Sequence, residues 1–128
     1  MNMNNTTTPE SEQDCAQTPW WFIESVEYFT SLKIKLDVCA YSNTAKSSFY
    51  CSLAENDNGL LDDWSNLNAN WCNPPYSDIK PWVEKASDES KLGCTTLMLI
   101  PDKTEVGYTR LARQHADTVI HMPFRLNF

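Results

Sequence analysis

The sequence lacks any hydrophobic run long enough to cross a bilayer, and its polar N-terminus has no signal-peptide core. We therefore expect a soluble protein of the cytoplasm with no membrane partner. Closely paired cysteines are missing too, because the five cysteines are scattered along the chain and no histidine stands near them. Since a zinc site needs such clusters, the sequence predicts reduced, mostly buried thiols and no bound metal.

Positive charge is scarce in the first part of the chain. The formal net charge is −7; residues 1–77 contain ten acidic side chains against three lysines, whereas residues 78–128 contain seven acidic and seven basic ones. Phosphate contacts favour a basic surface, so any surface that faces nucleic acid should come from the later part. For most of these cations, a solvent-exposed position without a ligand is the simpler explanation. The candidates are Lys80, Lys103, Arg110, Arg113 and Arg125.

The composition is nevertheless that of a folded protein. Hydrophobic residues make up 41% of the chain and aromatic residues 12%, and a length of 128 residues suits one domain. Residues 1–17 are rich in Asn, Thr, Ser and Gln, which predicts a disordered leader. We therefore assign a single domain to residues 18–128.

Helix and strand patterns alternate along this domain. Thr18 and Pro19 suit the first positions of a helix, and residues 41–50 read as a loop or short helix in which Phe49 and Tyr50 pack. Helices are predicted over residues 18–32, 79–90 and 106–115, and strands over residues 34–40, 69–72, 94–100 and 118–122, with one more starting at 125–128.

The predicted packing follows from the apolar spacing. The first helix should bury a face made of Trp21, Phe22, Val26 and Phe29. Residues 94–100 form the most hydrophobic run and should be a buried central strand. The alternation indicates an α/β fold with a mainly parallel sheet and crossover helices.

Two acidic positions are candidates for ligand contacts. Asp37 lies at the end of the strand over 34–40, where open α/β sheets place their ligand crevice, so it could meet a ribose or an amine. A cap for the next turn is the simpler explanation. Asp63 and Trp64 could bind the amino group and the ring of an adenine, or equally could be a surface cap beside a core tryptophan.

The stretch Asn73-Pro74-Pro75-Tyr76 is the strongest candidate site. The amide oxygen of Asn73 and the carbonyls around Pro74 are acceptors for both hydrogens of an exocyclic amine, and the prolines hold them in place. Tyr76 offers a flat face on which a base taken out of its stack could lie. Alone, the tetrapeptide leaves a turn and a site equally open.

The ordered set of motifs resembles a known family. The chain resembles the phage-type Dam-like DNA N6-adenine methyltransferases over roughly residues 18–128. The motifs that carry the resemblance are Thr18-Pro19-Trp20, Leu36-Asp37-Val38-Cys39-Ala40, Gly59-Leu60 with Asp63-Trp64, Asn73-Pro74-Pro75-Tyr76, Leu99-Ile100-Pro101 and Arg125-Leu126-Asn127-Phe128.

The resemblance implies a Rossmann-like methyltransferase that uses S-adenosylmethionine. Thr18 and Pro19 match the motif at the methionine end of this cofactor, and Asp37 and Ala40 belong to the cofactor strand and its loop. Asp63 and Trp64 match the acid and the hydrophobe at the cofactor's adenine. The loop after Asp37 offers Ala40 and Ser42 where many methyltransferases have glycines. About 35 residues separate Asp37 from Asn73, so the sheet should be abbreviated.

The resemblance also implies the substrate site. Asn73 and the Pro74 carbonyl would bind the N6 amine of a flipped adenine, with Pro75 and Tyr76 completing the catalytic motif. Double-stranded DNA is the expected partner, and Ser77, Lys103 and Arg125 are the residues expected to contact it. A homodimer or a host-protein partner is also consistent with the short chain.

Two other functions stay open at this stage. A methyltransferase-derived protein could bind the cofactor or a host protein with weak or no turnover, which would suit the acidic charge. The tetrapeptide also serves other planar amines, so cytosine, RNA or a protein glutamine are alternative substrates.

Overall fold

The structure is a computed structural model that describes residues 18–40, 44–47, 49–52, 59–102 and 107–122. The expected disordered leader over 1–17, the strand start at 125–128, and the candidate residues Lys103 and Arg125 lie outside these residues. Within the described chain, no helix is long and apolar enough to span a membrane.

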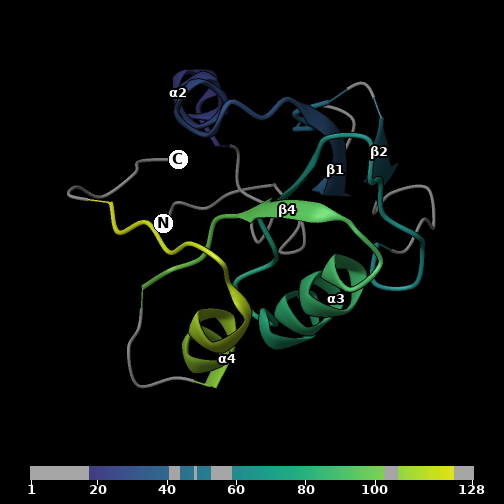
Figure 1. Cartoon of the computed structure of the whole chain (residues 1–128), viewed down its shortest axis with the longest axis vertical. Helices are drawn as coiled ribbons and strands as arrows, with labels where there is room; N and C mark the ends of the chain where they lie inside the picture. The colour runs from purple at the N-terminus through teal and green to yellow at the C-terminus, as the bar shows by residue number, and fades with distance from the viewer. Residues whose placement is uncertain (1–17, 41–43, 48, 53–58, 103–106, 123–128) are drawn as a thin grey trace, which may run out of the picture.

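A parallel sheet forms the centre of the fold (Figure 1). Its strands are β1 (Ile34–Ala40), β2 (Tyr50–Ser52), β3 (Ala69–Cys72) and β4 (Thr95–Met98), and their order across the sheet is β2-β1-β3-β4. Every neighbouring pair is parallel, with crossover connections. The α/β class predicted from the sequence is therefore confirmed, as are the strands over 34–40 and 69–72.

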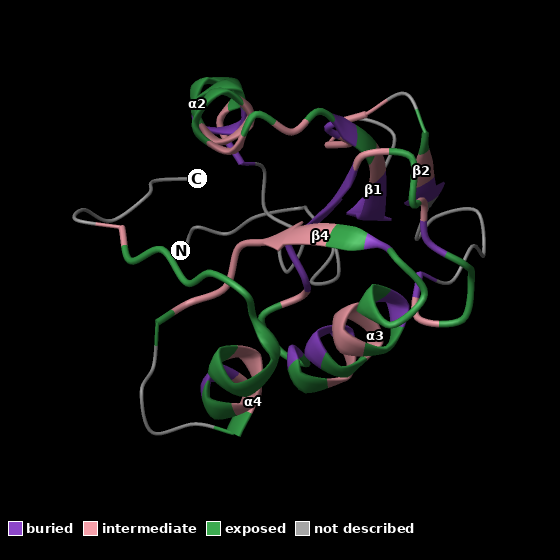
Figure 2. Ribbon diagram, in the orientation of Figure 1, coloured by how far each residue is buried: buried purple, intermediate pink, exposed green. Residues whose placement is uncertain are grey.

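Helices cover both faces of this sheet (Figure 1). On one face, α2 (Trp20–Thr30) buries Phe22 and Ile23 against Ile34 and Trp71. On the other, α3 (Lys80–Ser90) brings Trp82 against Val38 and Cys72, while α4 (Gly107–His115) packs beside α3. Figure 2 shows that β1, between these layers, is largely buried.

An irregularity in β1 lets one strand supply both cores. The register with β3 shifts between Ile34 and Leu36, where two positions on β1 face a single step on β3. Such a bulge interrupts the alternation of side chains. Ile34 consequently packs under α2, whereas Leu36 and Val38 pack under α3.

The first helix differs from its prediction in length and in orientation. It ends at Thr30 because Ser31 adopts a left-handed conformation with φ 59°. Trp21 and Phe29, expected on the buried face, are 53% and 74% exposed. Phe22 and Val26 pack toward the sheet as expected, Val26 only partly buried, and Ile23 joins them in place of Trp21 and Phe29, because a single helix buries only a narrow stripe.

The second correction concerns residues 41–50, of which 41–43 and 48 are not described. Tyr50 begins β2 instead of belonging to a loop or short helix, and Phe49 is 70% exposed instead of packed. The Phe49 carbonyl accepts a hydrogen bond from Asp37 N at 3.0 Å. Pairing with β1 therefore starts at Phe49 and leaves its ring in solvent.

The remaining corrections concern the later strands. The run 94–100 forms only the four residues of β4, which is the edge of the described sheet, and Thr95 is exposed while the next three side chains are partly buried. Residues 118–122 are not a strand, and Val119 and Ile120 are about half exposed. A hydrophobic run becomes a central strand only when strands pair with it on both sides. Within the described residues, β4 pairs with β3 alone, and residues 118–122 pair with no strand.

The two helices that follow the tetrapeptide Asn73-Pro74-Pro75-Tyr76 agree with their predictions. Trp82 and Val83 of α3 are buried and Ala86 is partly buried, as expected. The helix ends at Ser90, and in the turn that follows Gly93 has φ 94° and Cys94 N bonds back to the carbonyl of Glu89 at 3.1 Å. Helix α4 occupies 107–115 of the predicted 106–115, and Val106 is not described.

Candidate active site

The tetrapeptide directly follows β3, and its first residues are buried. Asn73 and Pro74 are buried, Pro75 is partly buried and Tyr76 is 39% exposed. A hydrogen bond from Asp78 N to the Pro75 carbonyl, 3.0 Å, closes the turn that leads into α3. Partial burial and the neighbouring Tyr108 raise the pKa of the Tyr76 hydroxyl, so this ring is neutral. The stretch therefore forms a turn, and its first residue, Asn73, also lines a small cleft that is described below.

A hydrogen bond connects the tetrapeptide to the start of the domain. Asn73 Nδ2 donates to Thr18 Oγ1 at 3.2 Å, across 55 residues of sequence. Both residues are buried. This bond fixes the orientation of the amide and directs Oδ1 away from the Thr18 hydroxyl.

Asp37 lies beside them at the carboxyl end of β1. Its carboxylate accepts hydrogen bonds from Lys46 N at 2.9 Å and from Cys39 N at 3.3 Å. Burial raises the pKa of Asp37 to about 7, although these bonds and the charge of Lys46 act in the opposite direction. Its turn-capping role and its position in a crevice are therefore both observed.

These residues line one small cleft. Its walls contain two of the residues expected at the cofactor and one expected in catalysis, together with neighbours that the sequence did not single out. The lining residues are Thr18, Asp37, Cys39, Thr44, Lys46, Trp71 and Asn73. The structure thus brings together three motifs that are separate in the sequence.

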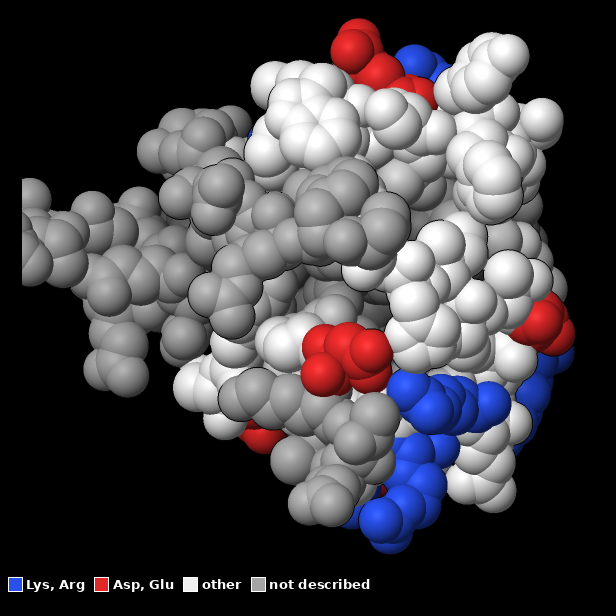
Figure 3. Space-filling view, turned by 90° about the vertical axis from the view of Figure 1, so that its left-hand side faces the viewer, with Lys and Arg blue, Asp and Glu red and all other residues white. Residues whose placement is uncertain are grey.

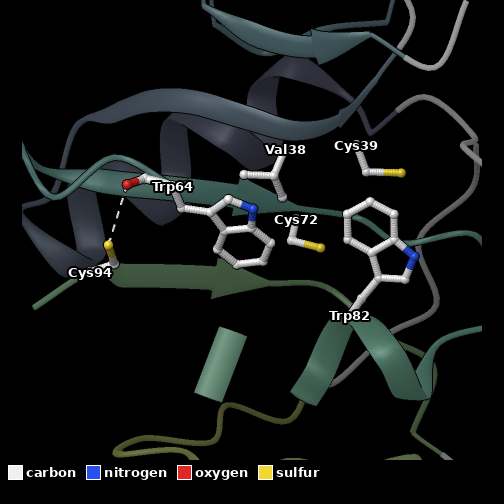
Figure 4. Packing of buried hydrophobic residues seen from close by; sticks show 6 residues of the cluster. All are labelled: Val38, Cys39, Trp64, Cys72, Trp82 and Cys94. Carbon is white, nitrogen blue, oxygen red and sulfur yellow. Dashed lines mark hydrogen bonds between the residues drawn. The ribbon is translucent and has the colours of Figure 1, made fainter. Parts of the chain in front are cut away.

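The Asp63 and Trp64 pair is divided between surface and core. Asp63 is exposed, whereas Trp64 is 5% exposed and packs with Val38 and Cys72 (Figure 4). The indole donates from Nε1 to the Gly59 carbonyl at 2.7 Å. Neither side chain lines the cleft at Asp37.

Gly59 allows this loop to approach the end of β1. A Cβ atom at position 59 would lie 2.1 Å from the Val38 carbonyl oxygen and 2.8 Å from the Trp82 ring. Only glycine fits without moving the backbone. The loop that contains Asp63 is therefore held between β1 and α3.

Glu89 is a buried residue that the sequence analysis did not identify. Its Oε1 accepts from Trp64 N at 2.8 Å, and Lys85 Nζ lies 3.0 Å from Oε2. Burial alone would raise its pKa, but these two contacts hold the pKa of Glu89 below its usual range. The Lys85 and Glu89 spacing on one helix was the available signal, although many exposed pairs share it.

The remaining expected residues fall in different places. Ala40 is buried at the end of β1, Pro19 is partly buried next to Thr18, and Ser77 is exposed in the turn after Tyr76. Four of the five cysteines are buried thiols, as predicted, and Cys15 lies outside the described residues. In the described part of the chain, no group of three or more His, Cys, Asp or Glu side chains could hold a metal.

Exposed cations gather near the last two helices. Figure 3 shows Lys and Arg side chains on the lower part of one face, at the level of α3 and α4. Lys80 on α3 and Arg110 on α4 are exposed, and Arg113 reaches Asp102 at 3.3 Å. His121 Nδ1 lies 2.9 Å from the other oxygen of Asp102.

Comparison with known proteins shows the family of the chain. Residues 5–128 match the family described as DNA N-6-adenine-methyltransferase (Dam). The chain belongs to this family. It is 32% identical over 98 residues to the DNA N-6-adenine-methyltransferase of Haemophilus phage HP1 (strain HP1c1), a match that covers 77% of this chain and 55% of that relative. The chain therefore spans about half the length of the curated relative that it matches, and no solved structure matches it.

Proposed function

We propose that the chain methylates the N6 amine of adenine in double-stranded DNA with S-adenosylmethionine as the donor. The observation that carries this proposal is the convergence of Thr18, Asp37 and Asn73 on one cleft at the carboxyl ends of β1 and β3. Parallel sheets bind their ligands at this edge. Membership of the Dam family supports the choice of reaction.

The tetrapeptide binds and orients the amine. The Asn73 amide, oriented by Thr18, and the Pro74 carbonyl accept the two N6 hydrogens, which draws the nitrogen lone pair out of conjugation with the ring. Tyr76 stacks on the flipped adenine through its exposed face. Because positioning and acceptor electrostatics carry the reaction, no general base is required.

The polar and charged lining of the cleft suits contacts to the amino acid end of the cofactor. Asp37 offers a carboxylate for an ammonium, and Thr18 offers a hydroxyl beside it. Pro19 and Ala40 complete this end, while the exposed carboxylate of Asp63, on the loop held by Trp64, would contact the adenine end. The bound cofactor supplies an electrophilic methyl group.

DNA would approach the face that contains α3 and α4. Tyr76 and Ser77 open toward solvent just before α3, and the exposed cations of these helices offer phosphate contacts. The expected contacts of Lys103 and Arg125 remain predictions. A cytoplasmic location and a homodimer or host-protein partner belong to the same proposal.

Nucleoside mass spectrometry tests the activity. DNA from methylation-deficient cells that express the chain should contain N6-methyladenine, and DNA from cells that express Asn73→Ala should contain none, because the amine loses its acceptor. Glu24→Ala, which removes an exposed side chain of α2 on the other face of the sheet, is the control and should keep most of the activity. The proposal is abandoned if soluble, folded protein leaves no N6-methyladenine in either sample.

A binding protein without turnover is the second candidate, and the net charge of −7 favours it because it opposes contact with DNA phosphates. Calorimetry with S-adenosylhomocysteine separates the two. Cofactor binding together with undetectable methyl transfer would favour this second function.

A further inference from the structure

Lys46 is a buried cation in the wall of the cleft. The residue as a whole is 8% exposed, and its Nζ lies 4.5 Å from the centre of the Trp20 ring. Within the described residues, no carboxylate oxygen lies within 4.0 Å of Nζ. A buried ammonium usually has an anionic partner, because burial alone is costly. Among the residues that the structure describes, Lys46 is therefore a cation without a contacting carboxylate.

Asp37 is the acidic residue that lines the same cleft as Lys46. Its carboxylate is engaged with the backbone N–H groups of Lys46 and Cys39, so the loop holds the two charges close together without letting them pair. Burial lowers the pKa of Lys46 while Asp37 opposes this change. One wall of the cleft thus offers a positive group and a negative group side by side.

We propose that Lys46 binds the α-carboxylate of the cofactor's methionine end, with Asp37 facing the α-ammonium. This inference rests on the proposed function, since it deepens the role of the same cleft. An α-amino acid carries both charges on one carbon, which matches the adjacent Asp37 and Lys46. A phosphate fits less well, because the Asp37 carboxylate would repel it.

Trp20 supports this role for Lys46. The ring face attracts the ammonium without neutralising it, so the charge is held at the cleft wall before a ligand arrives. Thr18, two residues before Trp20, forms the hydrogen bond to Asn73. The cofactor's amino acid end and the acceptor amide are therefore positioned by the same short segment.

The first test compares two ligands on the unmodified protein by calorimetry. Decarboxylated S-adenosylmethionine keeps the adenosine, the sulfonium and the amine but lacks the carboxylate. We expect it to bind roughly 10-fold to 100-fold more weakly than S-adenosylmethionine, because one charge-assisted hydrogen bond is lost. Equal affinity for the two ligands would overturn the assignment of Lys46.

The second test removes the cation. Lys46→Met should weaken binding of S-adenosylmethionine by a similar factor and leave the decarboxylated ligand nearly unchanged, so that the protein no longer distinguishes the two. Lys46→Arg should restore part of the discrimination. The matched control is Lys35→Met, which removes an exposed lysine of β1 and should change neither affinity.

These measurements separate a ligand contact from a purely structural role. If Lys46 only supports the loop, Lys46→Met weakens both ligands by the same factor, and the inference fails while the proposed function stands. If the unmodified protein, folded by circular dichroism, binds neither ligand, the proposed use of the cofactor fails, and the assignment of Lys46 fails with it. Discrimination that is lost only in Lys46→Met supports both.

Discussion

Asp37 and Glu89 are both buried carboxylates, yet their surroundings make them opposites. Each accepts a backbone N–H bond shorter than 3.0 Å, Asp37 from Lys46 and Glu89 from Trp64. Glu89 also contacts the Lys85 ammonium directly, and its pKa is lowered, whereas within the described residues no lysine ammonium contacts Asp37 and its pKa is raised to about 7. A buried carboxylate that contacts a cation, as Glu89 contacts Lys85, stabilises the fold. One that faces a cleft without that contact is suited to a ligand.

Glu89→Ala should give the largest effect. It leaves Trp64 N–H and the half-buried Lys85 ammonium without their partner, so we expect the free energy of unfolding to fall by about 3 to 5 kcal/mol. Urea denaturation at pH 7 measures this change. Glu84→Ala, on the exposed side of the same helix, is the control. A loss below about 1 kcal/mol would show that Glu89 does not stabilise the fold in the way that the comparison with Asp37 requires.

Asp37 should make the protein less stable as pH rises. Its folded pKa of about 7 lies above the ordinary value of 3.8, so the folded state binds more protons between these values. The contribution is present below about pH 4 and is lost as pH rises to about 7, with a total on the order of 2 to 4 kcal/mol. Urea denaturation of Asp37→Asn and the unmodified protein at pH 5.5 and 8 should show a flatter dependence in the variant. Identical dependence in both would contradict the raised pKa.

Lys85→Met should have the smallest effect and the opposite pH sign. The lowered pKa of Glu89 means that its contribution is present above pH 4.5 and is lost as pH falls through the folded pKa. Without Lys85 that pKa rises, so we expect acid unfolding at a higher pH and a loss of about 1 to 2 kcal/mol at pH 7. Circular dichroism during acid titration follows the transition. Should the midpoint stay fixed, Lys85 does not set the protonation of Glu89.

The sequence was sufficient where the signal is local. The apolar pattern of β1 predicted its strand, and the break from Cys72 into Asn73 and two prolines predicted that a strand ends there; the structure confirms both. Helix α3 was predictable because its apolar spacing and the glycine that ends it lie within fifteen residues.

Properties that depend on distant partners could not be predicted. The edge position of β4 depends on which strands lie beside it, and the same hydrophobic run would suit the centre of a sheet. Lys46 reads as an ordinary polar loop residue until the fold places it over Trp20 and beside Asp37. The end of α2 at Ser31 likewise has no glycine to announce it.

The hydrogen bond between Thr18 and Asn73 also has a consequence for folding. It closes a loop of 55 residues, which costs chain entropy, so it forms only after β1 and β3 have paired and brought the two ends together. A chain still emerging from the ribosome already contains Thr18 but has not yet made Asn73. We therefore expect the Asn73 amide to acquire its orientation late, so that an incompletely folded chain carries the tetrapeptide without the geometry that the proposed reaction would use.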